Sequence, residues 1–392
     1  MRILQIVEPC QAGVGRHVTD LTAGLLEARH QVHLLYSPLR IDERFRQALA
    51  GPCAAARSQP VRMLRRPSFD DRLAWRSIRR YIRQHGPFDI IHTHSTKAGV
   101  LGRLAALGLP GYRLHTPNAP LSLSPEIPAI CRWLAGACEQ VMGHLSDAVI
   151  AVSPSERDHL LSIGVPARRV HVVPNGIRLS GAATDEVRAA AQRRIGLCPG
   201  TPCIGFVGRL AAQKRCDVLL RAFALLPLCV RSRTRLVIVG DGALAGTLRR
   251  LAAELGIATN ITWMGEIDAS LVMPAFDLLA ISSSYEGLPY VLLEAMSLGL
   301  PVVSTRVGGT ELLVRDGLTG FTVPPLRSDL FASALESLLT DESLRVRLGH
   351  EARSRVELFG FDTMLRGVQA LYRLAGEKRE LGIGVTGRST VY

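Results

Sequence analysis

Short apolar runs alternate with segments of helical periodicity along the first half of the chain. A short apolar run bounded by turn residues is typical of a buried strand, and apolar residues three or four apart are typical of an amphipathic helix. The predicted strands are Arg2–Val7, Val32–Tyr36, Ile90–His92, Arg113–His115, Ala148–Val152 and Val170–Val173. The predicted helices are Leu21–Ala28, Arg72–Gln84, Ala98–Leu107, Ile127–Met142 and Ser155–Ile163. Strands that alternate with helices imply a parallel, doubly wound α/β sheet.

The same alternation restarts after the turn signal Pro174-Asn175-Gly176 and a small, polar stretch, Arg178–Thr184, which we interpret as a linker. The predicted strands there are Pro202–Val207, Arg235–Val239, Ile261–Met264, Leu278–Ile281, Pro301–Ser304 and Gly320–Val323. The predicted helices are Asp217–Leu225, Ala245–Leu255, Pro289–Leu298 and Asp362–Leu374. A chain of 392 residues suits two domains of ordinary size. We therefore expect two Rossmann-like parallel sheets.

One stretch of the second half carries two carboxylates close to a strand end. The apolar run Asp277–Ile281 predicts a buried strand. Pro289 suits the first helical position, where its missing N–H costs nothing, and Gly299 can cap the helix in the left-handed conformation. Glu286 therefore lies on a strand-to-helix loop and Glu294 in the second helical turn, at the edge where open α/β sheets bind ligands. Carboxylates accept hydrogen bonds from hydroxyl groups, so a sugar and a ribose are natural ligands.

The stretch Glu286–Glu294 resembles the signature of the family 4 glycosyltransferases, in which seven residues separate two Glu residues. The resemblance runs from Arg2 to about Leu374 and implies the GT-B fold, two Rossmann-like domains that face each other across a cleft. It implies an acceptor domain (1–177), a nucleotide-sugar donor domain (178–360), a helix that crosses back to the first domain (361–375) and a loose tail (376–392). It also implies that Glu294 binds the ribose, and that Glu286 holds sugar hydroxyls together with the backbone of Gly287 and Leu288.

A second motif closes the first predicted strand of the second half. Gly208-Arg209-Leu210, followed three residues later by Lys214, matches a pattern of the same family. The resemblance implies that Arg209 and Lys214 hold the donor diphosphate. Two cations can neutralise the leaving phosphates as negative charge grows there. The alternative is a pair of surface cations on a loop.

Two further turns are similar to donor-binding loops of the family. Gly13 and Gly15 follow the first strand, where glycines let a backbone approach a phosphate and a helix N-terminus favours negative charge. The usual first Gly of this loop is Ala12 here. Met264-Gly265 matches the base-contacting loop, whose backbone could read a uracil edge. Either turn alone can also be purely structural.

The segment Ile91–Gly99 ends a strand with His92 and His94 and starts a helix with Lys97. It is similar to a segment found in polysaccharide-assembly members of the family. His94 and Lys97 could bind a phosphate or a sugar acceptor, and they could equally be capping or solvent-facing groups. We expect the imidazoles of His92 and His94 to point to opposite faces of the strand and so to form no metal site.

Many family members carry a His at the next strand end, where it contacts the donor sugar near the reacting centre. The closest pattern aligns this His with Asn118, and His115 lies three residues earlier. Asn118 can donate and accept hydrogen bonds but cannot become a cation. Both residues therefore stay in the predicted catalytic set, with Arg209, Lys214 and Glu286.

No Asp-x-Asp pair occurs in the chain, although glycosyltransferases that hold the diphosphate through a divalent metal usually need one. We expect no metal and no cofactor, because cationic side chains and helix N-termini can hold the phosphates. The resemblance implies retaining transfer of a sugar from a nucleotide diphosphate sugar, most often UDP-linked, to a glycan or lipid-linked acceptor in cell-surface polysaccharide or glycolipid assembly. The alternatives are a GT-B nucleotide-sugar epimerase and a nucleotide-sugar-binding protein without turnover.

The net charge of +13 is concentrated in the first half, where residues 1–180 hold 23 Lys and Arg against 13 Asp and Glu. This suggests an acidic partner, for which we favour an anionic membrane surface, and solubility alone is the alternative. Five arginines of one predicted helix have the spacing of a single face: Arg72, Arg76, Arg79, Arg80 and Arg83. Nucleic acid is not favoured, since aromatic residues make up only 5% and do not interleave with the basic ones.

No apolar run approaches the roughly 18 residues of a membrane span. The N-terminal strand is interrupted too soon, by Glu8 and Pro9, for a signal peptide. We therefore expect a cytoplasmic protein, at most peripheral on the inner face of the membrane. The eight Cys residues show no zinc-ligand spacing and are expected to be reduced and mostly buried.

Overall fold

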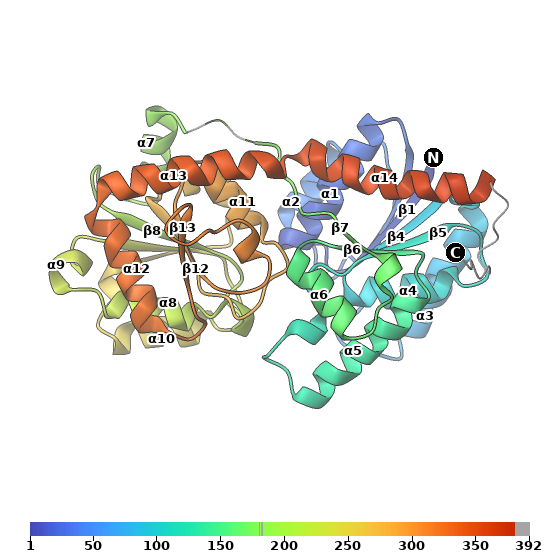
Figure 1. The fold of residues 1–392 in the computed structure, drawn as a ribbon, viewed down its shortest axis with the longest axis horizontal. Coiled ribbons are helices and arrows are strands. Elements are labelled where there is room, and N and C mark those ends of the chain that lie inside the picture. Colours follow the sequence, from blue (N-terminus) through green and yellow to red (C-terminus); the bar gives the residue numbers. More distant parts are fainter. Residues whose placement is uncertain (180, 182, 381–392) are drawn as a thin grey trace, which may run out of the picture. The chain divides into compact units, whose positions relative to one another are not determined.

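A computed structural model describes residues 1–179, 181 and 183–380 (Figure 1). The described chain divides into two compact units, each built on one parallel sheet. Unit 1 contains Met1–Ser122, Ile130–Pro174 and the chain from Asp362 on, and unit 2 contains Leu123–Ala129 and Asn175–Phe361. The stretch Leu123–Ala129, inside the predicted first domain, thus packs with unit 2.

Unit 1 has seven parallel strands in the order β3-β2-β1-β4-β5-β6-β7. They are β1 (Arg2–Val7), β2 (Gln31–Tyr36), β3 (Arg57–Pro60), β4 (Ile90–His94), β5 (Tyr112–Thr116), β6 (Ala148–Ala151) and β7 (Val170–Val172). The helices are α1 (Ala12–Glu27), α2 (Glu43–Ala50), α3 (Asp71–His85), α4 (Thr96–Ala106), α5 (Ala129–His144), α6 (Pro154–Ser162) and α14 (Phe361–Glu380). The strand order reverses between β1 and β4, and ligands of open α/β sheets bind at such a point.

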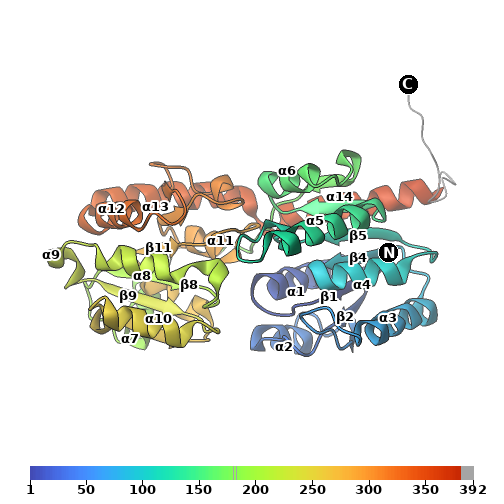
Figure 2. The same cartoon turned by 90° about the horizontal axis from the view of Figure 1, so that it is seen from below.

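The two faces of this sheet bury alternate residues of β1 under different helices, as the two-residue period of a strand requires. Leu4 and Ile6 pack with apolar residues of α3 and α4, whereas Val7 packs with Val18 of α1 and Phe45 of α2. In two perpendicular views α4 lies between α3 and α5 (Figures 1 and 2). Helix α14 packs on the sheet, where Tyr372 is fully buried.

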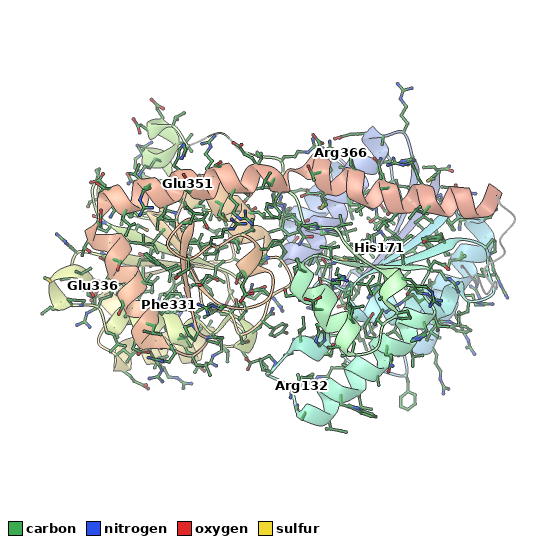
Figure 3. All side chains as sticks on the ribbon, in the orientation of Figure 1. Arg132, His171, Phe331, Glu336, Glu351 and Arg366 are labelled. Atoms are coloured by element: carbon green, nitrogen blue, oxygen red, sulfur yellow. The ribbon has the colours of Figure 1, made fainter. Side chains whose placement is uncertain are left out.

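Unit 2 has six parallel strands in the order β10-β9-β8-β11-β12-β13. They are β8 (Cys203–Val207), β9 (Arg235–Val239), β10 (Ile261–Gly265), β11 (Leu278–Ile281), β12 (Val302–Thr305) and β13 (Gly320–Val323). The helices are α7 (Asp185–Arg194), α8 (Cys216–Ala224), α9 (Leu228–Arg231), α10 (Ala245–Glu254), α11 (Tyr290–Ser297), α12 (Ser328–Thr340) and α13 (Glu342–Val356). Phe331 of α12 is fully buried in the main core of this unit (Figure 3). The strand order reverses between β8 and β11, so the loops after these two strands lie at the predicted ligand edge.

The predicted fold class, two doubly wound parallel sheets, is confirmed. Several polar elements were missed, including the fully exposed edge strand β3 and the helices α2, α7 and α13. Helix α14 runs to Glu380, beyond its predicted end, so the predicted loose tail begins inside it. The rest of that tail, 381–392, lies outside the described residues.

All eight cysteines are free, but only half of them are buried, which corrects the expectation that most would be. Cys131, Cys138, Cys198 and Cys229 are exposed. Among the described residues, no helix combines the length and the apolar character needed to cross a membrane.

Candidate active site

The turns that follow β8, β9 and β10 pack against one another at the carboxyl edge of the sheet in unit 2. Gly208 N donates a hydrogen bond to Val239 O (3.0 Å), and Gly240 N donates one to Gly265 O (2.7 Å). A Cβ on Gly240 would lie 2.2 Å from Gly208 O, so only glycine permits this approach. The predicted Gly208 and Gly265 therefore both lie against Gly240, and Met264 directly precedes Gly265 at the end of β10.

Lys214 and Glu286 form an ion pair at the same edge. Lys214 Nζ lies 2.5 Å from Glu286 Oε1, and Ser283 Oγ donates to that same oxygen (2.6 Å). The carboxylate side chain is 7% exposed and the lysine side chain 18%. The two residues are 72 positions apart in the chain and meet because β8 and β11 are adjacent strands. The structure thus joins the cation predicted for the diphosphate to the carboxylate predicted for the sugar.

The loop that carries Glu286 is held by the short 3-10 helix Ala212–Lys214. Gln213 Nε2 donates to Tyr285 O (3.1 Å), and Gln213 O accepts from Ser284 N (2.8 Å). Ser282 Oγ donates to Lys214 O (2.9 Å). These contacts fix the backbone on both sides of the ion pair, which preorganises a polar site before any ligand is present. Arg209 is half-buried two residues after β8 ends.

Helix α11 follows this loop and carries Glu294 in its second turn, as expected, with its side chain half-buried. Gly299 has the predicted left-handed conformation (φ +75°) after the end of the helix. Pro289 is the N-cap residue with extended backbone, not the first helical residue, so the helix begins one position later than predicted. Gly287 and Leu288 are buried between the ion pair and the helix.

In unit 1 the predicted glycine turn is mostly the first turn of α1. Ala12 opens the helix at φ +51°, a conformation typical of glycine, and its N–H donates to Asp42 Oδ2 (2.7 Å). A Cβ on Gly15 would lie 2.8 Å from the carbonyl carbon of Cys10, so Gly15 serves a close packing contact. Gly13 is exposed.

His92 and His94 lie on one face of β4, which corrects the expectation that they diverge. Residues two apart on a strand share a face, and these ring centroids are 4.1 Å apart. His92 pairs through Nδ1 with Tyr372 Oη and through Nε2 with Thr116 Oγ1, both at 2.8 Å. His94 is fully buried beside His17, and neither of its ring nitrogens has a hydrogen-bond partner. Burial holds the pKa of both His92 and His94 well below the ordinary value.

No group of three or more His, Cys, Asp or Glu side chains in the described part of the chain is arranged to hold a metal ion. The histidines of β4 form a buried polar cluster inside unit 1. The predicted role of His94 in binding an acceptor or phosphate has no exposed atom to support it.

His115 is fully buried on the opposite face of the sheet. Its Nδ1 lies 2.9 Å from Thr93 Oγ1 and its Nε2 lies 3.4 Å from Glu139 Oε1. A Cβ on Gly99 would lie 2.4 Å from its ring, which shows how closely α4 covers it. Burial and the nearby Arg103 cation lower its pKa well below the ordinary value. No atom of His115 is open to a substrate, so we retain Asn118 and withdraw His115 from the catalytic set.

Asn118 lies on the loop after β5, and Lys97 lies in the first turn of α4, both at the carboxyl edge of the first sheet. Asn118 is half-buried at φ +54°, and the next residue, Ala119, donates its N–H to the buried carboxylate of Glu156 (2.9 Å). Lys97 Nζ contacts Asp71 Oδ2 (2.5 Å) and donates to Arg66 O (3.0 Å). Lys97 thus ties α4 to the start of α3 in this structure.

Comparison with known proteins agrees with this geometry. The model described as Glycosyltransferase Family 4 matches residues 12–180, and the one described as Glycosyl transferases group 1 matches residues 188–355. D-inositol 3-phosphate glycosyltransferase of Rhodococcus jostii is 32% identical over 315 residues, which cover 76% of this chain and 69% of that protein. The same-named protein of Nocardia farcinica is 31% identical over 321 residues, which cover 76% of this chain and 70% of that protein.

The chain belongs to glycosyltransferase family 4. It is therefore a transferase, and the resemblance drawn from its motifs is confirmed. Among solved structures, HepE of Anabaena in complex with UDP-glucose has a TM-score of 0.80 at 21% identity, covering 95% of this chain and 100% of HepE. Sucrose-phosphate synthase of Thermosynechococcus elongatus has a TM-score of 0.82 at 22% identity, covering 96% and 99%. These similarities confirm the GT-B fold.

Two contacts that support the site of this glycosyltransferase were not predicted from the sequence. Asn175 Nδ2 donates to Leu288 O (2.8 Å), although the sequence indicated only a turn at this position. Gly309, at φ +83°, lies so close to Gly287 that a Cβ would come within 1.6 Å of Gly287 O. Both contacts set the backbone that was predicted to hold sugar hydroxyls. Neither could be found from spacing, because each depends on a neighbour far away in the chain.

We expect Gly309→Ala to reduce transferase activity at least about 100-fold, because a displacement of about 1 Å in a preorganised site has that scale of effect. Gly317→Ala is the matched control, since Gly317 also has a positive φ (+69°) but nothing lies within 4 Å of its Cβ position. Backbone strain is then common to both variants and the collision with Gly287 is not. Initial rates are measured on samples shown by thermal melting to be folded. Equal rates for the two variants would contradict the assigned role of this contact.

We expect the free energy of unfolding to fall as pH drops below about 6.5, the ordinary pKa of histidine. His92, His94 and His115 have lowered pKa values when folded, so below that pH the unfolded chain binds more protons. Each contributes a slope of up to about 1.4 kcal/mol per pH unit, and the stability is fully present above pH 6.5. Urea unfolding between pH 5 and pH 8 checks this. His94→Leu should flatten the profile, and an unchanged slope would be evidence against it.

Proposed function

We propose that this enzyme transfers a sugar from a UDP-linked donor to a glycan or lipid-linked acceptor, with retention of the anomeric configuration, in cell-surface polysaccharide or glycolipid assembly. The observation that carries the proposal is the Lys214–Glu286 pair, with Glu294 in the second turn of the helix that follows. A cation, a carboxylate and a second carboxylate in this order suit the phosphates, the sugar and the ribose of a nucleotide sugar. The UDP-glucose bound in the HepE structure, which has the same fold, supports the choice of donor.

In the proposed reaction the bond from the sugar's anomeric carbon to the diphosphate oxygen breaks, and a bond to the acceptor hydroxyl oxygen forms. The leaving diphosphate takes the proton of that hydroxyl on the same face of the sugar. Arg209 and Lys214 stabilise the charge that develops on the diphosphate. Lys214 can contact both Glu286 and a phosphate oxygen, because an ammonium group has three donors. The ion pair then aims the lysine without using up its hydrogen-bonding capacity.

Glu286 would accept hydrogen bonds from the sugar hydroxyls, which the backbone of Gly287 and Leu288 would also contact. Glu294 would accept hydrogen bonds from the ribose hydroxyls. The backbone of Met264 and Gly265 would read the base. Asn118 would contribute hydrogen bonds from unit 1. No metal or cofactor enters the scheme, since Arg209 and Lys214 supply the positive charge that stabilises the leaving diphosphate.

Mass spectrometry of products from a panel of UDP- and GDP-sugars, with and without a lipid-linked acceptor extract, tests the proposal. A new nucleotide sugar formed without acceptor would show an epimerase instead.

We also propose that unit 1 docks reversibly on the inner, anionic face of a cell membrane. Four arginines of α3 are exposed: Arg72, Arg76, Arg80 and Arg83. Arg79, which its spacing placed with the membrane-facing arginines, instead donates hydrogen bonds to Ala105 O (2.9 Å) and Leu107 O (2.8 Å) at the end of α4. Phe69 and Leu73, at the start of the helix, are 88% and 64% exposed. This combination of cations and exposed apolar groups suits a lipid surface.

We expect Glu294→Gln and Lys214→Ala each to reduce transfer by at least about 100-fold, the usual scale for losing one preorganised polar contact in a transition state. Glu254→Gln, on the exposed side of α10, is the control and should leave the rate unchanged. Initial rates with saturating donor and acceptor provide the measurement. A folded Glu294 or Lys214 variant with a near-normal rate would remove that residue from the site.

We expect EDTA to leave the transfer rate largely unchanged. The physical reason is that Arg209 and Lys214 offer the positive charge that a divalent ion would otherwise supply to the leaving diphosphate. The rate is compared before and after dialysis against EDTA. Complete loss of activity, restored by magnesium or manganese, would show a metal-dependent reaction.

We expect co-sedimentation with vesicles to require anionic lipid and to weaken at high salt. Each arginine near such a surface contributes about 1 kcal/mol, so changing Arg72, Arg76, Arg80 and Arg83 to Gln should nearly abolish binding. A control with the same loss of charge changes four exposed arginines of unit 2 to Gln: Arg193, Arg194, Arg250 and Arg347. Equal recovery of the enzyme with neutral and anionic vesicles would contradict the docking proposal.

A further inference from the structure

Helix α5 turns its large apolar side chains away from the core of unit 1. Ile130, Trp133, Leu134 and Val141 are 62%, 66%, 54% and 56% exposed. Their spacing of three, one and seven residues places them along one side of a helix, which we call the outer face of α5. A helix packed on a sheet normally shows the opposite pattern, with apolar residues inside and polar residues outside.

The inner face of α5 is held by an ion pair and by small residues instead. Its buried residues are Gly136, Glu139, Met142 and Gly143. Glu139 Oε1 accepts from Nη1 and Nη2 of the fully buried Arg103 of α4, both at 3.2 Å. A Cβ on Gly143 would lie 2.8 Å from Val165 Cγ1, so the helix also closely approaches the turn that follows α6. The helix is therefore docked firmly while its apolar side chains stay in water.

Exposed apolar area of this kind is costly unless something covers it. Four large side chains on one helix face, one of them Trp, are more than the isolated apolar residues that ordinary surfaces carry. Tryptophan with one apolar body and one N–H donor is the residue best suited to the boundary between lipid and water. The composition of the outer face thus indicates a lipid headgroup region.

The charges around α5 favour the same occupant. Helix α4 lies between α5 and α3, so the exposed arginines of α3 belong to the same layer of helices (Figure 2). A surface that combines apolar side chains with arginines complements an anionic bilayer. A second copy of the chain would instead bring like charges together.

We propose that the outer face of α5 inserts into the interfacial region of an anionic bilayer, with Trp133 at the level of the headgroups. The inference rests on the proposed membrane partner and goes beyond it. Arginines of α3 supply attraction to the surface, and α5 supplies an apolar anchor that enters it. An anchor of this kind would hold unit 1 in a fixed orientation on the membrane, since two separated elements contact the same plane.

The test uses the full chain and vesicles of phosphatidylglycerol and phosphatidylcholine, with some lipids brominated on their acyl chains. Binding should shift the tryptophan emission to the blue and quench it with the brominated lipids. Trp133→Phe should remove most of both effects, because Trp75 and Trp263 are already half-buried. Circular dichroism establishes that each variant is folded.

The paired variant Ile130→Ser/Leu134→Ser should weaken vesicle binding by at least about tenfold, on the scale of losing the burial of apolar side chains. Leu228→Ser/Val346→Ser is the matched control, since these side chains are 69% and 67% exposed on unit 2, and it should bind like the wild type.

Binding that survives the α5 variants but fails with the α3 arginine variant would overturn the insertion while leaving the docking proposal in place. Failure of the wild type to bind any vesicle would overturn both. Trp133 fluorescence that the brominated lipids do not quench would overturn the inference. A molecular mass that rises with concentration, and that the α5 variants abolish, would also overturn it by assigning the outer face to a second copy of the chain.

Discussion

The contact between Lys214 and Glu286 is the interaction on which the donor half of the site depends. It joins the loops that follow β8 and β11, two adjacent strands at the reversal point of the sheet in unit 2. Removing one partner of a buried ion pair leaves the other charge unpaired, and such a loss costs about 3–5 kcal/mol. Because Glu286 is only 7% exposed, loss of the lysine cation would leave a nearly buried carboxylate without its charged partner. The pair is therefore both a structural link and a preformed binding element.

The surrounding backbone explains why this pair can stand ready for a ligand. Gln213, Ser282 and Ser284 connect the two loops by hydrogen bonds, and Asn175 and Gly309 hold the next residues from the other side. Unit 1 uses buried polar pairs in a different way. His92 with Tyr372 attaches α14 to the sheet, and Arg103 with Glu139 attaches α5 to α4. In both cases a buried polar pair fixes one face of a helix. For α5 this leaves the outer face exposed.

The sequence predicted those features that depend on neighbouring residues. Strands β1, β11 and β13 have their predicted bounds, because each is an apolar run closed by polar or turn residues. Strand β3 was missed because Arg57–Pro60 has no apolar residue and lies exposed at the sheet edge. The positions of Glu286, Glu294 and Lys214 followed from motifs, but the direct contact between Lys214 and Glu286 did not.

Features that depend on tertiary contacts could not be predicted in this way. Asn175 and Leu288 are 113 residues apart, and only the folded chain shows that one supports the other. Arg79 has the spacing of an exposed residue, but the carbonyl groups at the end of α4 bind it. His115 stands near an aligned functional position and is nevertheless covered by α4.

The most direct test of the account is calorimetric binding of UDP, and of the UDP-sugar that supports transfer, to the wild type, Lys214→Met and Glu286→Gln. If Lys214 holds the diphosphate and Glu286 the sugar, Lys214→Met weakens both ligands at least about tenfold, the scale of one hydrogen bond to a charged group. Glu286→Gln then weakens only the UDP-sugar and leaves UDP affinity within about twofold, because Lys214 keeps its phosphate contact. Unchanged affinities with Lys214→Met, or an equal loss of UDP and UDP-sugar affinity with Glu286→Gln, would contradict this division of roles.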